Sequence, residues 1–222
     1  MRFAIPVIAL VFSAAGSAFA DESWPPLFRD AVAPYEGEDA EHRYDMSLSL
    51  GSGDVIFRYS YDPASETPLV IHEIRDEASE ADIAESVADD EDDIWCDGLD
   101  ERVLGDVELS SETDETATYT FTPTVPDSAD DFERQVAERS IGTVVIDKAN
   151  RQIVSFNYHL PQSFKPVFIA RIHSFDMAGT CEVAPSGRRY LSELTMSFDV
   201  SAMGRRQSES SIQRVENVEW VR

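Results

Sequence analysis

The chain has few basic side chains and little cysteine for its length of 222 residues. Eighteen lysines and arginines stand against 43 aspartates and glutamates, which gives a formal net charge of −25. Binding to nucleic acid through phosphate contacts requires clustered basic residues, so this composition excludes a nucleic-acid partner. The two cysteines form no C-x-x-C motif, which disfavours a redox motif or a zinc knuckle.

The sequence also lacks the short motifs that mark common catalytic and cofactor sites. It contains no G-x-S-x-G, no H-E-x-x-H, no phosphate-binding loop and no dinucleotide fingerprint. Carboxylates are so abundant that a pair of them does not indicate a glycosidase. His159 and His173 could approach each other on neighbouring strands, either as a metal pair or as ordinary solvent-facing histidines. We therefore expect no enzyme, no cofactor and no metal site.

Residues 1–20 have the features of a secretory signal peptide. Arg2 precedes an apolar stretch over residues 3–12, and the segment ends in a small-residue A-x-A pattern at Ala20. We expect cleavage after Ala20 and export to the periplasm, with an uncleaved anchor as the alternative. The apolar stretch is too short to span a bilayer, and no later segment reaches that length. The mature chain, residues 21–222, is expected to be one exported domain with no transmembrane segment.

Export would place the two cysteines in a compartment where disulfides form. Cys96 and Cys181 are then expected to pair with each other, with two free buried thiols as the alternative. For a loop of this length the chain-entropy model gives about 4.5 kcal/mol of stabilisation, as an upper figure.

Negative charge is concentrated in the N-terminal part of the mature chain. Residues 21–139 hold 35 acidic and 7 basic side chains, whereas residues 140–222 hold 8 and 10. The densest run, residues 89–93, lies in an acidic helix or loop insertion over residues 76–101. Like charges at that density repel each other, which favours a solvated loop, and a loose site for a divalent cation is the alternative. The spacing of an EF-hand is absent.

Apolar and polar residues alternate over much of the chain, with turn residues between the alternating segments. This period of two predicts antiparallel strands joined as hairpins. In one such segment Val154, Phe156, Tyr158 and Leu160 are expected to share a face. Short helices are expected over residues 23–33 and 79–88, and a short helix or a loop over residues 127–138. Some nine strands are expected from ten candidate segments, residues 44–50, 55–61, 68–74, 107–109, 116–122, 142–146, 152–160, 167–183, 190–200 and 207–218.

A sheet of this size must bury one face, and a large flat sheet curls. We therefore predict an α+β fold that is mostly β, a large curved antiparallel sheet or half-open barrel with a few short helices packed on its concave side. Aromatic and methionine side chains recur on the inward face of the strands. They either fill a core or line an apolar cavity, which would suit a lipid-like ligand. These residues are Tyr44, Met46, Phe57, Tyr59, Tyr119, Phe121, Phe156, Tyr158, Met196 and Phe198.

The last third of the chain resembles a known family. Residues 142–153 read G-T-V-V-I-D-K-A-N-R-Q-I. They resemble the late hairpin of outer-membrane lipoprotein-sorting proteins, the LolA/LolB-like group, in which long strands follow to the C-terminus. Residues 163–166 and 187–191 also resemble uncharacterised exported proteobacterial proteins with that sheet. The resemblance covers about residues 140–222, and residues 43–75 by pattern.

This resemblance implies a half-open barrel with a helical lid, whose cavity holds the acyl chains of lipoproteins in transit across the periplasm. The leading hypothesis is a non-enzymatic periplasmic binder or carrier of an apolar ligand, a lipid or an acylated lipoprotein. The second hypothesis is an envelope interaction module with a packed core, whose acidic face meets a basic partner or divalent cations. A hydrolase without a recognisable motif is the third.

Overall fold

The computed structural model describes residues 22–37, 41–75, 81, 83–84, 87, 94–125 and 129–221 of the chain. The expected signal peptide at residues 1–20, the acidic run at 89–93 and most of the expected helix at 79–88 lie outside these residues. Among the described residues, no helix combines the length and the apolar character that crossing a membrane requires.

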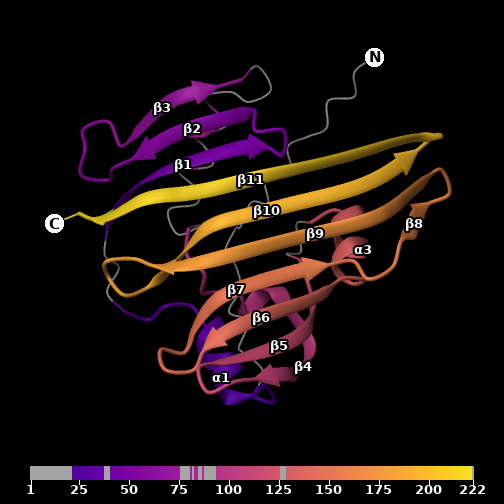
Figure 1. Cartoon of the computed structure of the whole chain (residues 1–222), viewed down its shortest axis with the longest axis horizontal. Coiled ribbons are helices and arrows are strands. Elements are labelled where there is room, and N and C mark those ends of the chain that lie inside the picture. The colour runs from indigo at the N-terminus through magenta and orange to yellow at the C-terminus, as the bar shows by residue number, and fades with distance from the viewer. Residues whose placement is uncertain are drawn as a thin grey trace.

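Eleven strands form one antiparallel sheet, shown in Figure 1. Along the sheet their order is β3-β2-β1-β11-β10-β9-β7-β6-β5-β4, and β8 pairs with β9 outside this path. Strands make up 58% of the described residues and helices 12%, so the expected α+β fold, mostly β and with one large antiparallel sheet, is confirmed. The strands are β1 (His42–Leu50), β2 (Val55–Tyr61), β3 (Leu69–Ile74), β4 (Val103–Glu112), β5 (Thr116–Pro123), β6 (Ile141–Asp147), β7 (Gln152–His159), β8 (Phe164–Val167), β9 (Ala170–Val183), β10 (Arg189–Ala202) and β11 (Arg205–Trp220).

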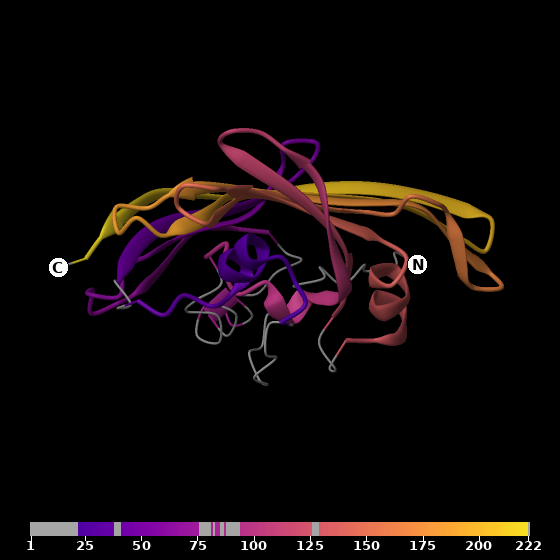
Figure 2. The same cartoon turned by 90° about the horizontal axis from the view of Figure 1, so that it is seen from below.

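The C-terminal strand β11 lies between the first strand β1 and the penultimate strand β10. It therefore joins the N-terminal hairpins to the rest of the sheet. The sheet arches strongly, as Figure 2 shows, but its edge strands β3 and β4 do not meet, so the sheet is not closed.

Short helical segments lie beneath the arch, on its concave side (Figure 2). They include α1 (Pro26–Val32), the 3-10 helix η1 (Asp100–Arg102) and α3 (Asp131–Ala137). A proline occupies the first turn of α1, where its missing N–H costs nothing. Phe28 of α1 is fully buried, and its ring makes edge contacts with Tyr119 and Phe121 of β5 at centroid distances of 5.5 and 5.8 Å. Helix α1 therefore covers the β5 end of the sheet.

Helix α3 covers a different part of the concave side. Asp130 and Glu133 form a capping box at its N-terminus, which satisfies backbone N–H groups that lack a helical partner. Val136 packs with Leu160 and Ile172 in a small apolar cluster. Of the two alternatives for residues 127–138, the helix is therefore confirmed over residues 131–137.

Two local expectations about the strands are wrong. Residues 167–183 do not form one strand, because β8 ends at Val167 and β9 begins at Ala170, which leaves Phe168 and Ile169 as a turn. Val154 does not share the inward face of its neighbours, because a β-bulge shifts the pairing of β6 with β7. Ile153 is buried in its place.

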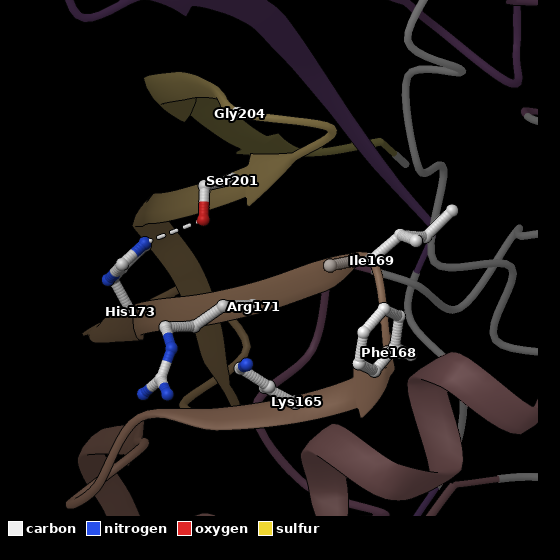
Figure 3. A pocket seen from close by; sticks show the side chains of 8 residues that line it. Lys165, Phe168, Ile169, Arg171, His173, Ser201 and Gly204 are labelled. Carbon is white, nitrogen blue, oxygen red and sulfur yellow. Dashed lines mark hydrogen bonds between the residues drawn. The ribbon is translucent and has the colours of Figure 1, made fainter.

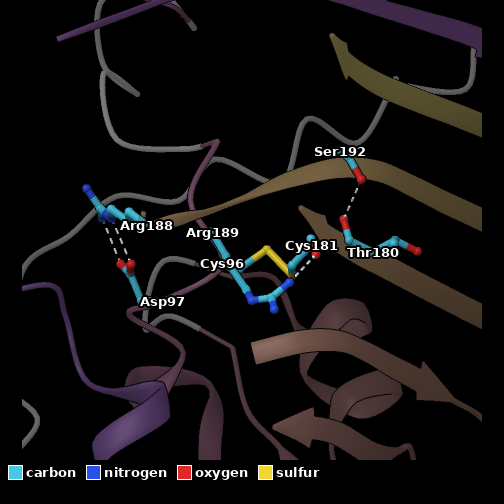
Figure 4. The surroundings of a disulfide bond; sticks show 7 residues. All are labelled: Cys96, Asp97, Thr180, Cys181, Arg188, Arg189 and Ser192. Carbon is cyan, nitrogen blue, oxygen red and sulfur yellow. Dashed lines mark hydrogen bonds and ion pairs between the residues drawn. A yellow bond between two sulfur atoms is a disulfide. The ribbon is translucent and has the colours of Figure 1, made fainter. Parts of the chain in front are cut away.

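A disulfide joins Cys96 to Cys181, as expected from the sequence (Figure 4). Cys181 lies in β9, whereas Cys96 lies in the segment that precedes η1. The N–H of Cys96 also donates to the carbonyl of Arg189 at 3.1 Å. The disulfide therefore attaches a loop segment to the concave side of the sheet.

Candidate functional site

The ten side chains expected to line a ligand cavity do not form one group. Phe198 belongs to neither of the two large apolar clusters of the structure. Five belong to the first cluster, built on α1, β5, β6, β7, β9 and β10: Tyr119, Phe121, Phe156, Tyr158 and Met196. Four belong to the second cluster, built mainly on β1, β2, β3 and β11: Tyr44, Met46, Phe57 and Tyr59.

Strand β11 separates these two clusters, because most of its inward positions are polar. Val215 is buried in the second cluster. Two residues earlier, Gln213 lies between Leu48 of β1 and Leu194 of β10, and Ser211 lies between the next apolar pair. The apolar lining is therefore interrupted across the middle of the sheet. In the part of the chain that the structure describes, no cavity lies over the ten side chains, and their role as ligand contacts stays a prediction.

Aromatic rings fill the space within the first cluster. A Cβ atom added to Gly142 would lie 2.5 Å from the ring of Phe121, and one added to Gly179 would lie 2.3 Å from the ring of Phe156. The ring of Tyr158 contacts both aromatic rings, at centroid distances of 6.0 and 5.7 Å. Burial here raises the pKa of Tyr158 to about 12. These rings act as core.

A row of apolar side chains on β10 is only partly buried. We call it the β10 row and define it as Leu194, Met196, Phe198 and Val200. Leu194 and Met196 contact the first cluster, and Val200 contacts the small cluster near α3, so the row follows the concave face. Phe198 lies between Phe175 of β9 and Glu209 of β11. The row is thus apolar on one side and borders polar side chains on the other.

A recess lies elsewhere, at the end of the sheet where β8 turns into β9 (Figure 3). Lys165 and Arg171 alternate with Phe164 and Ile172, which pack in the cluster near α3, so the two cations lie on the opposite face of this hairpin. His173 lies 2.9 Å from the hydroxyl of Ser201. The recess has a volume of about 290 Å³ and is lined by Lys165, Phe168, Ile169, Ala170, Arg171, His173, Ser201 and Gly204.

None of the ten sequence-predicted residues lines this recess. Sequence reasoning missed it because the alternating pattern was continued as one strand from Val167 to Val183. The signal for a turn was the adjacent apolar pair Phe168 and Ile169, which interrupts the alternation of apolar and polar residues. This pair lies between the basic residues Lys165 and Arg171.

Asp45, Ser60 and His72 form a chain of hydrogen bonds across β1, β2 and β3. The Ser60 hydroxyl donates to Asp45 at 2.5 Å and lies 2.7 Å from Nε2 of His72, and Asn217 donates to the other Asp45 oxygen at 2.7 Å. These hydrogen bonds lower the pKa of Asp45. Because the hydroxyl proton points to the carboxylate, Nε2 of His72 must donate and does not act as a base toward Ser60. The arrangement is a cross-strand link rather than a nucleophile and its base.

The histidines considered as a metal pair have other neighbours. His159 pairs in register with Asp176 of β9, and His173 contacts Ser201. The described residues contain no group of three or more His, Cys, Asp or Glu side chains that could hold a metal ion.

Asp100 of η1 carries a buried carboxyl group. It is 6% exposed, and within the described structure its Oδ1 atom has no hydrogen-bond partner. Burial raises the pKa of this carboxyl above its ordinary value. The charged form therefore costs the fold free energy.

Comparison of the chain with protein-family models, with curated proteins and with solved structures found no match. The resemblance of residues 142–153 to the LolA/LolB-like sorting proteins stays a prediction.

Proposed function

We propose that this protein is an exported, non-enzymatic binder or carrier of an apolar ligand, the acyl chain of a lipid or of a lipoprotein. The observation that carries the proposal is the β10 row, which lies partly exposed on the concave face of an open sheet. Alternate residues of a strand are about 7 Å apart, so the row extends over about 20 Å, enough to contact much of an acyl chain.

The strand beside the row supports an amphiphilic ligand. Gln207, Glu209 and Ser211 of β11 pair with Val200, Phe198 and Met196 in register. A ligand could bury its chain against β10 while its polar end stays over β11. The Cys96–Cys181 disulfide supports export, since disulfides persist in oxidising compartments such as the periplasm.

Binding of a fluorescent fatty acid to the mature protein tests the β10 row. F198E places a charge in the row and is expected to weaken binding at least tenfold, because the acyl chain would desolvate it. Phe198 belongs to neither large cluster, so the fold tolerates the change. V70E, at an exposed apolar position of the edge strand β3, is the matched control and should bind like the original protein. Equal affinity of both variants, or no saturable binding at all, would contradict the proposal.

The packing of the two clusters favours a second candidate, an interaction module whose acidic surface meets a basic partner. Glu108 and Glu112 are exposed on the edge strand β4, in the acidic part of the chain. Association with a basic protein that disappears as salt is added would indicate this function. The alternative that the acidic surface binds divalent cations rests on residues 89–93, which lie outside the described residues. A calcium titration tests this alternative.

A further inference from the structure

Two neighbouring hairpin turns at one end of the sheet expose large apolar side chains. Phe168, in the turn between β8 and β9, is 92% exposed, and Met203, in the turn between β10 and β11, is 77% exposed. Both turns lie at the right-hand end of Figure 1. The N–H of Met203 donates to the carbonyl of Ile169 at 3.0 Å, which joins the turns. We call residues 163–173 and 199–206 the tip.

In each of the two turns a large apolar residue occupies a position where tight turns favour other residues. Two-residue hairpin turns are usually built from Gly, Asn and Asp. In the tip, Phe168 and Ile169 form one turn, and Met203 with Gly204 forms the other. Met203 has a φ of 51°, a conformation that residues other than Gly, Asn and Asp seldom adopt. Neither core packing nor backbone geometry explains these apolar residues, so their side chains point to a role in binding.

The tip is basic although the protein is strongly acidic. It holds four basic side chains and one acidic side chain, a net charge of +3, against −25 for the whole chain. The one acidic residue, Asp199, pairs with Arg206. Lys165, Arg171 and Arg205 form no ion pair with any described residue. Lys165, Arg171 and Phe168 line the same recess, as Figure 3 shows. Exposed apolar and cationic groups therefore occur together.

We infer that the tip docks on the surface of an anionic lipid bilayer. Phe168, Ile169 and Met203 enter the headgroup region, while Lys165 and Arg171 bind lipid phosphates, a combination typical of interfacial membrane binding. The recess of about 290 Å³ between these groups has room for a phosphate. The acidic remainder of the protein is repelled by the same surface, which confines contact to the tip. This inference goes beyond the proposed function. None of its steps depends on a residue of the β10 row.

Flotation with vesicles of phosphatidylglycerol and phosphatidylcholine tests the inference on the mature protein. F168S removes an exposed ring, and M203N removes an apolar side chain while introducing a residue that accepts positive φ. Each variant is expected to bind these vesicles about tenfold more weakly. K165Q and R171Q should each weaken binding about fivefold. Vesicles of phosphatidylcholine alone should bind the original protein less than the anionic vesicles do.

L109S on β4 and R214Q on β11 are matched controls, because both side chains are exposed and lie outside the tip. They should bind vesicles like the original protein. The inference is overturned if the original protein does not bind, if tip and control variants bind equally, or if neutral vesicles bind as well as anionic ones. Saturable binding of inorganic phosphate without vesicle binding also overturns it. Fatty-acid binding measured in parallel on F168S shows whether this inference or the proposed function has failed.

Discussion

Arg188 ties the segment that carries Cys96 to the sheet through one guanidinium group. It donates hydrogen bonds to both oxygens of Asp97, at 2.8 and 2.7 Å (Figure 4). The guanidinium carbon also lies 4.4 Å from the ring centre of Trp95 and 4.9 Å from that of Tyr35. Its side chain is only 11% exposed. Lysine can reproduce neither the paired hydrogen bonds nor the stacking.

The R188K variant is therefore expected to lower the free energy of unfolding by about 1–2 kcal/mol, measured by urea denaturation. R58K is the matched control, because the pair of Arg58 with Glu73 is exposed on both sides and should contribute less than about 0.5 kcal/mol. Equal losses in the two variants would show that the stacked arginine is dispensable.

Asp100 gives a prediction with a defined pH dependence. Its pKa is raised in the folded state, so its charge destabilises the fold at neutral pH, and this cost disappears as pH falls through the raised pKa toward the ordinary value of about 3.9. D100N should therefore raise the unfolding free energy at pH 7, by about 1–3 kcal/mol if the unpartnered oxygen dominates. The difference from the original protein should vanish below about pH 4. A difference that is independent of pH would refute the assigned cause.

At the scale of the elements, the disulfide is the main link between the loop segment 94–97 and strand β9. Without the disulfide the unfolded chain has more conformational freedom, and the folded protein loses the link between this segment and β9. The C96A/C181A variant is expected to lose about 2–5 kcal/mol of unfolding free energy. Urea denaturation with and without reductant measures this loss. Reductant should lower the midpoint of the original protein and leave that of the variant unchanged, and the opposite pattern would contradict the account.

The strands show what a local pattern can and cannot predict. Alternation identifies strands such as β1 and β2 because each presents one apolar face to the core. It does not show which distant strands pair. Because β11 pairs with β1, the polar Gln213 lies beside Leu48 and interrupts the apolar lining. Bulges and tight turns change the register by one residue, which explains the errors at Val154 and at Phe168. The alternation therefore predicts aromatic and methionine residues on an inward face, but it does not predict that nine of the ten divide between two clusters.

At the scale of the whole molecule, charge and apolar surface are divided among different regions. The acidic side chains belong mainly to residues 21–139, whereas the tip near the C-terminal hairpins is basic. The β10 row lies on the concave face between α3 and the first cluster. Such a division would let one end of the protein contact a membrane surface while the concave face holds an acyl chain.

Native mass spectrometry of the protein purified from a bacterial periplasm, beside a solvent extract of the same sample, tests whether it binds an apolar ligand. We expect a mass excess that matches an extracted lipid and that is smaller or absent in F198E. A bare protein mass with no lipid in the extract, together with no uptake of added fatty acid, would contradict the binding of an apolar ligand.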